Sequence, residues 1–292
     1  MENINTFKEL IKVCEKNNKT IYEAVLDYEA QIGENSEYKT RVQAKRTLDA
    51  MKAAIKRGIK SSELSPSGLS GDDCKKLQKY FSHNNSLLSK MAQKTMVYAL
   101  ATSEENLRMG IIAACPTAGS CGIVPSILTS YSELYEIPEE IEINALLTAG
   151  VIGKIISNKL SPSGAMGGCQ AECGTASAMA AAALTQMRGG DIYQIINSSA
   201  LAIKNILGLT CDPVCGLVEI PCVKRNPFLA LHALTASELA LSGIISKIPA
   251  DEVIDAMAQT AQLMSPLLKE SSQGGLAKTK TALELEKTIL KK

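Results

Sequence analysis

Cys169-Gln-Ala-Glu-Cys-Gly-Thr-Ala-Ser-Ala-Met-Ala-Ala-Ala-Ala-Leu184 is the stretch of this sequence that decides the fold class. Alanine has the highest helix propensity, and its small side chain lets neighbouring helices approach closely. The segment Ser161-Pro-Ser-Gly-Ala-Met-Gly-Gly168 comes just before it and is too rich in Gly, Ser and Pro to continue a helix. The sequence therefore predicts a closely packed helix that begins at Cys169, directly after a loop.

Apolar residues recur at helical spacing on both sides of this stretch. They predict helices over residues 4–13, 21–28, 37–60, 74–107, 123–135, 139–156, 192–207, 230–245 and 251–264. Few segments alternate with a period of two, and no Asn-Gly hairpin signal occurs. We therefore expect an all-α fold with Gly/Ser/Pro-rich loops. An N-terminal helical segment, 1–60, should pack on a main domain, 61–292, to form one compact unit.

The composition excludes several classes of partner. Lys and Arg number 31 against 30 for Asp and Glu, so no overall field attracts nucleic acid or an anionic membrane. Aromatic residues make up 4% of the chain, which argues against a base-stacking surface. The longest apolar stretch, 228–246, contains His232 and Glu238 and is better explained as a buried helix than as a membrane span. The amino terminus lacks the features of a signal peptide, which predicts a cytoplasmic protein.

Nine cysteines are the most informative residues for function. An odd number without an export signal argues against a disulfide framework. Five of them lie between Cys169 and Cys222, a clustering that indicates metal or redox chemistry, although a cysteine-rich core is the alternative. No Cys-x-x-Cys pair occurs, which disfavours a zinc ribbon or a thioredoxin-like site. The spacing by itself leaves open which cysteines are ligands.

The tetrapeptide Ser-Pro-Ser-Gly occurs twice, at 65–68 and 161–164, each time just before a predicted helix. Such loops can turn backbone N–H groups and hydroxyls towards one small anion. Two unrelated helix-capping turns explain the same pattern equally well.

Several ordered segments resemble the signatures of the iron–sulfur L-serine dehydratase family, from about residue 60 to the carboxyl terminus. They are Ser65-Pro-Ser-Gly-Leu-Ser-Gly-Asp72, Pro116-Thr-Ala-Gly-Ser-Cys-Gly-Ile-Val-Pro125, Gly168-Cys-Gln-Ala-Glu172, Cys211-Asp-Pro-Val-Cys-Gly-Leu-Val-Glu-Ile-Pro-Cys-Val-Lys-Arg-Asn226 and Gly274-Gly-Leu-Ala277. The continuation Lys278-Thr-Lys-Thr-Ala282 departs from the family pattern, which leaves the role of the tail open.

The resemblance implies a [4Fe-4S] cluster held by Cys169, Cys211 and Cys222, whereas Cys121, Cys173 and Cys215 stand where the family has small or aliphatic residues. It also implies that L-serine is deaminated to pyruvate and ammonium without pyridoxal phosphate. The expected substrate contacts lie in the hydroxyl-rich loops and just after the third ligand. They are Ser65, Ser67, Gly68, Thr117, Ala118, Gly119, Ser120, Ser163, Gly164, Lys224, Arg225 and Asn226.

The general base is not identified by the sequence. His83 lies in a polar stretch and His232 in an apolar helix, so neither is a strong candidate. The family's second half forms a separate β subunit in two-chain enzymes, and we expect the base on that partner. Assembly with further copies of this chain stays open. Two alternatives remain: a related lyase acting on L-threonine or L-cysteine, and a non-catalytic redox-sensing homologue.

Overall fold

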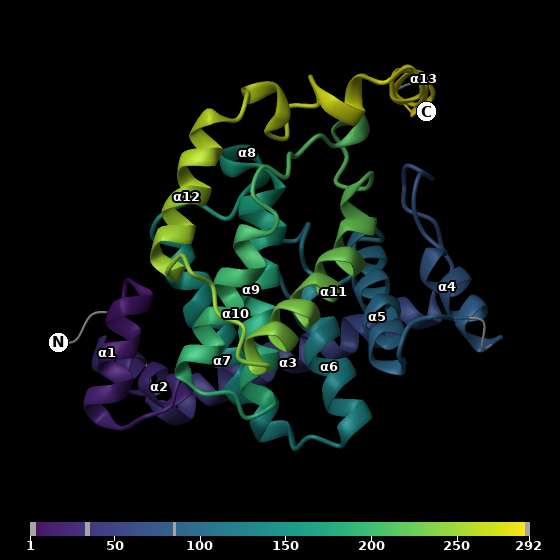
Figure 1. Ribbon diagram of the computed structural model, residues 1–292. Helices are drawn as coiled ribbons and strands as arrows, with labels where there is room; N and C mark the ends of the chain where they lie inside the picture. The colour runs from purple at the N-terminus through teal and green to yellow at the C-terminus, as the bar shows by residue number, and fades with distance from the viewer. Residues whose placement is uncertain (1–3, 33–35, 84–85, 290–292) are drawn as a thin grey trace.

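The computed structural model describes residues 4–32, 36–83 and 86–289, and helices account for nearly all of its regular structure (Figure 1). The first three residues of the amino-terminal segment that argued against a signal peptide lie outside these ranges. Within the described ranges, strand-like pairing is limited to two isolated bridges, Leu64–Gly71 and Cys211–Lys269. The all-α prediction is confirmed.

The elements follow one another in chain order with short connections. They are α1 (Phe7–Asn17), α2 (Ile21–Ile32), α3 (Glu37–Lys60), α4 (Asp73–Ser82), α5 (Lys90–Leu107), α6 (Ile123–Tyr135), α7 (Glu139–Ser157), α8 (Gly164–Gly167), α9 (Cys169–Met187), α10 (Ile192–Lys204), η1 (Val214–Gly216), α11 (Cys222–Leu241), α12 (Ala250–Leu263), η2 (Pro266–Leu268), η3 (Gly275–Lys278) and α13 (Lys280–Ile289).

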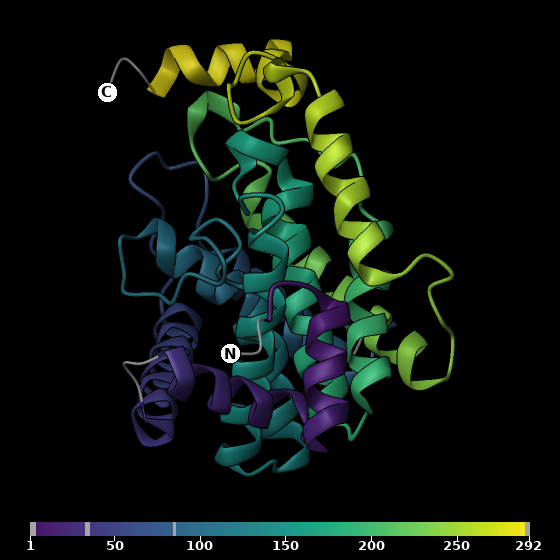
Figure 2. The same ribbon diagram turned by 90° about the vertical axis from the view of Figure 1, so that its left-hand side faces the viewer.

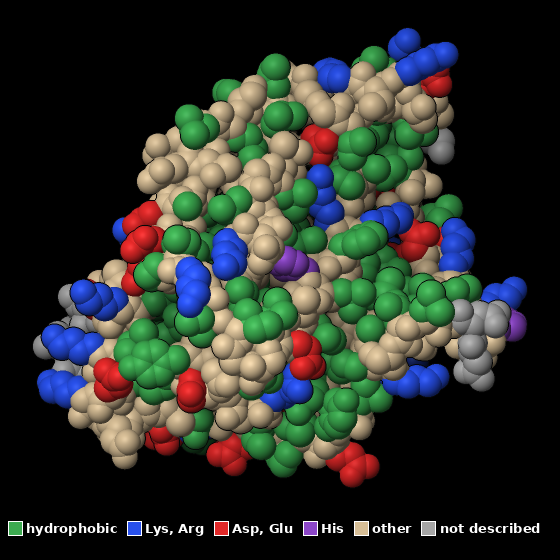
Figure 3. All heavy atoms as spheres, in the orientation of Figure 1, with side chains coloured by type: hydrophobic (Ala, Val, Ile, Leu, Met, Phe, Trp, Pro, Cys, Tyr) green, Lys and Arg blue, Asp and Glu red, His purple; other side chains and the backbone are tan. Residues whose placement is uncertain are grey.

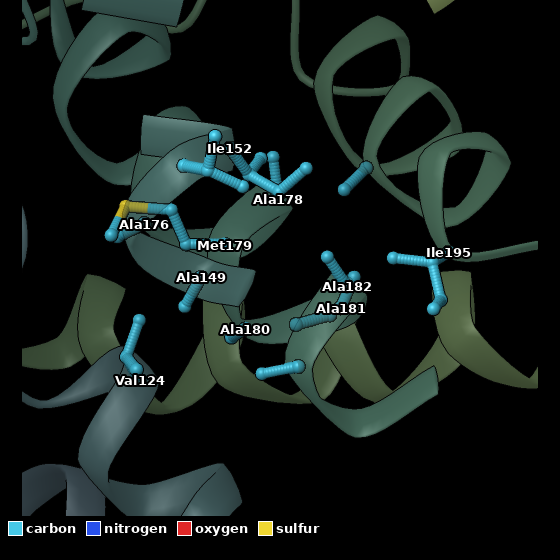
Figure 4. Packing of buried hydrophobic residues seen from close by; sticks show 14 of the residues in the cluster. Val124, Ala149, Ile152, Ala176, Ala178, Met179, Ala180, Ala181, Ala182 and Ile195 are labelled. Atoms are coloured by element: carbon cyan, nitrogen blue, oxygen red, sulfur yellow. The ribbon is translucent and has the colours of Figure 1, made fainter. Parts of the chain in front are cut away.

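The alanine-rich helix α9 forms the centre of the molecule, surrounded by α6, α7, α10 and α11 (Figure 1). Its residues are buried all round, as expected of a helix without a polar face. Figure 4 shows Ala176, Ala178 and Ala180–Ala182 packed among larger side chains such as Ile152 and Ile195 of the neighbouring helices. The alanines thus do what the sequence predicted: they let four helices approach one axis.

Helices α3 and α5 meet at a glycine. A Cβ atom built on Gly58 would lie 2.0 Å from the backbone oxygen of Ala101, so only glycine permits this crossing. Gly150 in α7 is the opposite case, because a Cβ there would meet no atom within 4 Å.

We expect Gly58→Ala to lower the free energy of unfolding by about 1–3 kcal/mol, because the backbone of α5 must move to make room for the added methyl group. Gly150→Ala is the matched control and should raise stability by about 0.5–1 kcal/mol, since alanine is the better helix former. Urea denaturation of the two variants measures both values. Equal stability of the two variants would contradict the close crossing.

The first three helices are tied to the rest of the chain by polar contacts. The Lys52 ammonium of α3 lies 2.6 Å from the buried carboxylate of Glu142 in α7. The Asp251 carboxylate of α12 accepts hydrogen bonds from the backbone N–H groups of Phe7 and Lys8, at the start of α1. These contacts span the predicted boundary at residue 60, and the division into two units stays a prediction.

The segment after α12 crosses one end of the helical bundle, the end at which α8 and the start of α9 lie (Figures 1 and 2). Two backbone hydrogen bonds fasten it there: Cys211 N–H donates to Leu268 O at 2.8 Å, and Glu270 N–H donates to Cys211 O at 2.7 Å. The carboxyl-terminal residues therefore reach the neighbourhood of the predicted cluster cysteines.

Three departures from the predicted helices exceed a shift of a few residues at one end. The stretch 74–107 is two helices, because Ser89 accepts a hydrogen bond from Ala92 N–H and caps a new start at α5. Helix α11 begins at Cys222, eight residues earlier than predicted, and includes Pro227 in its first turns. Helix α13 lies in a segment for which no helix was predicted.

Charged side chains of both signs are interspersed with apolar ones on the face shown in Figure 3. No helix within the described ranges is both long enough and apolar enough to span a bilayer.

Candidate metal centre

The site is built around the first residue of α9. Gly168, which precedes it, has a φ of +74°, and a Cβ there would come within 2.8 Å of Leu209 O and of the Met264 sulfur. This turn, which favours glycine, places Cys169 at the positive end of the dipole of α9, a buried helix at the centre of the bundle. The Cys169 side chain is fully buried.

Cys211 meets Cys169 from a different part of the chain. The backbone bonds to Leu268 and Glu270 hold its main chain, and its sulfur lies against Gly164, where an added Cβ would come within 2.7 Å. The Ser161–Gly164 loop is therefore close to this thiol because it has no side chain at the point of contact.

Ligand atoms of Cys169, Glu172 and Cys211 all lie within 4.8 Å of one another, and all three residues are buried. Cys222 opens α11 and is 5% exposed; burial and the charge of Cys169 raise the pKa of its thiol to about 12. Two converging thiols, a neighbouring third thiol and a buried carboxylate form a donor set that suits iron. The residues present thus fit a metal or cluster.

Cys169 carries the negative charge of the group. Hydrogen bonds from Cys173 and Cys211, together with the charge and hydrogen bond of the Arg225 guanidinium, hold its pKa well below the ordinary thiol value against the opposing effect of burial. The same contacts raise the pKa of the Cys173 and Cys211 thiols, because each donates to the thiolate and is buried beside it. A thiolate that exists before metal arrives is the form in which cysteine binds metal.

Arg225 is the cation that faces this thiolate. Its Nη1 donates to Cys169 Sγ at 2.9 Å and to Thr210 O at 2.8 Å, while Nη2 lies 3.1 Å from Asp212 Oδ1. The Arg225 side chain is 15% exposed and the Asp212 side chain is 7% exposed. Charge-assisted hydrogen bonds at such depth orient both partners.

The carboxyl-terminal glycine motif docks on Asp212. Leu276 N–H donates to Asp212 Oδ2 at 2.8 Å. Gly275 has a φ of +57°, and a Cβ there would fall 2.4 Å from the same carboxylate oxygen. The chain Cys169–Arg225–Asp212–Leu276 thus connects the start of α9 to the segment that covers it, which explains the Gly-Gly-Leu-Ala pattern.

Glu172 lies one turn after Cys169 and faces the Thr117–Ser120 loop. Its Oε1 accepts a hydrogen bond from Thr117 Oγ1 at 2.5 Å, and Thr117 Oγ1 lies 3.0 Å from Ser120 Oγ. Burial raises the pKa of the Glu172 carboxyl to about 7, although the Thr117 hydrogen bond opposes this rise. The site therefore contains a group that can gain or lose a proton near neutral pH.

Asn226 joins the loop to α11. Its amide nitrogen donates to Gly119 O at 2.8 Å and to Cys222 O at 3.0 Å, and its oxygen accepts from Gly122 N–H at 2.9 Å. The side chain is completely buried, and its amide nitrogen donates only to backbone carbonyl groups. In this conformation it positions the loop.

The Ser65–Gly68 loop reaches the site through Glu219. Both hydroxyls donate to its carboxylate, Ser65 to Oε2 and Ser67 to Oε1, each at 2.7 Å. Gly119 of the other loop packs next to the same segment, because a Cβ built on it would lie 3.1 Å from Val218 and 2.5 Å from Glu172. The 65–68 loop, through Glu219, and the 117–120 loop, beside Val218, therefore meet at the segment just before Cys222.

The structure brings together most of the predicted residues and separates a few. Lys224 turns away, with its ammonium 2.5 Å from Asp73 of α4. Ser163 caps α8 through Ala165 N–H, Gly68 closes a turn onto Ser65 O, and Ala118 is exposed at the outer edge of its loop.

Residues given no part in the site also have clear places. Cys121 is buried beside Thr102 O, and the half-buried Cys215 lies near Ala282 O. Cys173 does touch the site, through Cys169. His83 is exposed, and His232 lies 2.8 Å from Ala202 O.

Sequence reasoning missed Glu172, Glu219 and Asp212 as site residues. All three lie inside the quoted motif segments, and this was the available signal: an acidic residue within a cysteine motif. Their partners are 55, 154 and 64 positions away along the chain, so no local pattern could reveal them.

Comparison with known proteins places this site in a family context. The family model described as serine dehydratase alpha chain matches residues 16–277. A probable L-serine dehydratase alpha chain of Bacillus subtilis is 45% identical, covering 97% of this chain and 94% of that protein. An L-serine dehydratase alpha chain of Peptoniphilus asaccharolyticus is 38% identical and covers 99% of both chains. An L-serine dehydratase of Mycobacterium bovis is 37% identical over 92% of this chain, but this match covers 60% of that longer protein.

Proposed function

The chain belongs to the serine dehydratase alpha-chain family, and from this membership we propose that it is the α subunit of an L-serine ammonia-lyase. The reaction converts L-serine to pyruvate and ammonium. The observation that carries the proposal is the meeting of Cys169, Cys211 and Glu172 under loops rich in hydroxyl groups.

A [4Fe-4S] cluster would be held by Cys169, Cys211 and Cys222, with Arg225 beside the first of them. When bound, it supplies a Lewis-acidic iron that polarises the substrate hydroxyl, an effect worth several kcal/mol in the transition state. The lowered pKa of Cys169 and the convergence of the donors support this assignment.

The hydroxyl-rich loops would hold the substrate's polar groups. Thr117 and Ser120 are oriented by Glu172, and Ser65 and Ser67 are oriented by Glu219, before any ligand arrives. A preorganised polar site loses little energy to reorganisation when charge develops in it. The Arg225 guanidinium contributes positive charge next to the cysteines.

Glu172 is the proton-exchanging group that this chain contributes. Its pKa of about 7 lets the carboxyl either hold or release a proton at Oε1 or Oε2 under neutral conditions. We propose that the base for the Cα proton comes from a partner chain and that Glu172 donates a proton to the leaving hydroxyl group. The relatives' designation as alpha chains supports a separate partner.

The test is spectroscopic. The full chain is reconstituted with iron and sulfide without oxygen, and its absorption and reduced-state EPR spectra are recorded with L-serine and with D-serine as the matched control. A four-iron spectrum that L-serine alone perturbs supports the proposal. If L-threonine or L-cysteine perturbed the spectrum equally at a lower concentration than L-serine, that amino acid would replace L-serine as the assigned substrate. The failure of any cluster to form would overturn the function.

A further inference from the structure

A cavity of about 450 Å³ opens on the far side of the loop that carries Thr117. It lies between α2, α3, α7 and α9, and apolar side chains form its walls, among them Val25, Met51, Leu147 and Met179. A volume of this size and an apolar lining with a few polar groups are typical of small-molecule sites. None of the residues that the site above requires lies in its wall.

Two charged side chains stand in the lining. The Lys154 ammonium lies 3.7 Å from the centroid of the Tyr28 ring, and Glu29 follows Tyr28 directly. No described residue forms an ion pair with either side chain, although most other buried or half-buried charges in these ranges are paired. The cavity thus combines an apolar interior with one ammonium group, that of Lys154, which contacts an aromatic ring but no carboxylate of the described residues.

Gly150 keeps the cavity open. It lies in α7 between Leu147 and Lys154, and a Cβ built on it would meet nothing within 4 Å. Because Gly150 itself lines the cavity, we expect a larger side chain at this position to occupy part of it.

The same cavity borders the segment that leads into the proposed active site. Cys115 and Pro116 line it, and Thr117, the next residue, donates its hydroxyl to Glu172. Met179 belongs to α9, the helix that begins with Cys169. An occupant would therefore press on the segment that carries the 117–120 loop and on the helix that carries the first cysteine.

We propose that this cavity is a second ligand site, which takes a small carboxylic acid with an apolar body. The carboxylate pairs with Lys154, and the body fills the space over Gly150. Glu29 provides a place for an ammonium group, so the chemistry fits both an apolar amino acid and an apolar oxo acid. Occupation restrains the 115–120 segment. The binding itself does not depend on the proposed lyase activity.

Three probes that share the same sec-butyl side chain distinguish the roles of carboxylate and ammonium: L-isoleucine carries both groups, 3-methyl-2-oxopentanoate only the carboxylate, and 2-methylbutan-1-amine only the ammonium. Calorimetry on the full, iron-free chain should show that both carboxylates bind and that the amine does not. Tighter binding of isoleucine than of the oxo acid identifies an amino acid site through Glu29; the reverse identifies an oxo acid site. Lys154→Met should weaken the carboxylates about three- to tenfold, the effect of losing one charged hydrogen bond at a half-exposed position.

The cavity itself is tested with Gly150→Phe against Gly150→Ala. The phenylalanine variant should lose binding while keeping its fold by circular dichroism, and the alanine variant should keep both. Hydrogen exchange at 115–120 should slow when isoleucine or the oxo acid binds. Three results would overturn the proposal: equal binding of the amine, binding unchanged in Gly150→Phe, or self-association of the chain that Gly150→Phe abolishes. The last would identify the cavity as a protein interface.

Because these measurements need neither iron nor turnover, their failure is distinguishable from failure of the lyase assignment. A chain that binds the probes but forms no cluster would retain this site and lose the proposed activity. A chain that forms a serine-responsive cluster but ignores the probes would retain the activity and lose this site.

Discussion

Cys211→Ala should bind far less iron and lose turnover by more than about a hundredfold. Cys211 is one of the two thiols in the compact donor group, and two backbone hydrogen bonds and the close contact with Gly164 hold it in place there. Loss of an outer partner of a metal ligand already costs about 10- to 100-fold, so loss of a ligand should cost more. Iron content per chain after anaerobic reconstitution measures the first effect, and pyruvate formation after addition of the partner chain measures the second.

Cys215→Ala is the matched control, because Cys215 lies four residues further along the same loop but outside the donor group, near Ala282 O. It should keep iron and activity close to the unmodified chain. Removal of iron by a chelator should bring the unmodified chain down to the level of Cys211→Ala. If Cys211→Ala retained a full complement of iron, the assignment of this thiol would be wrong.

Arg225→Met should strongly destabilise this chain and weaken its iron binding. It leaves the carboxylate of Asp212, which is 7% exposed, without its cation, and it removes the guanidinium from the Cys169 thiolate. Breaking a buried pair on one side costs about 3–5 kcal/mol, because the remaining charge stays buried and uncompensated. We expect that loss in the free energy of unfolding by urea, together with weaker iron binding.

Lys224→Met provides the comparison at the neighbouring position. The Lys224 side chain is 47% exposed, and its ammonium pairs with Asp73 at the surface, an arrangement that contributes about 0–1 kcal/mol. Arg225→Lys should fall between the two, since lysine keeps the charge but cannot reach Cys169, Thr210 and Asp212 together. Similar losses for Arg225→Met and Lys224→Met would show that Arg225 does not serve as the buried cation of the site.

Local sequence patterns predicted the helices well where apolar spacing and breakers agreed. The limits of α3 and α6 match the predicted 37–60 and 123–135, and α9 starts at Cys169 as expected. The break between α4 and α5 was missed because Cys74 to Leu107 keeps a helical pattern of apolar residues, whereas the new start at α5 depends on a serine cap at Ser89. A cap of this kind depends on one hydrogen bond, which periodicity does not report.

Other errors came from contacts with distant parts of the chain. The early start of α11 places Cys222 beside the other cysteines, and Asn226 of its first turns is fixed by the backbone of Gly119 and Gly122. The local sequence did not predict a helix start at Cys222, because Pro213, Gly216 and Pro221 are all typical of a loop. Tertiary packing overrides local propensity here.

The sequence by itself determined the helical class and the central alanine-rich helix, because these depend on residue type and short-range spacing. The choice of Cys169, Cys211 and Cys222 as ligands came from the family resemblance and stays a prediction. Only the tertiary structure decided that Glu172 faces Thr117, that Asp212 receives the Gly-Gly-Leu-Ala segment, and that Lys224 turns away while Arg225 turns inward. The physical reason is that a buried charge is stable only where partners from other parts of the chain surround it. Those partners are chosen by the packing of helices far apart in sequence.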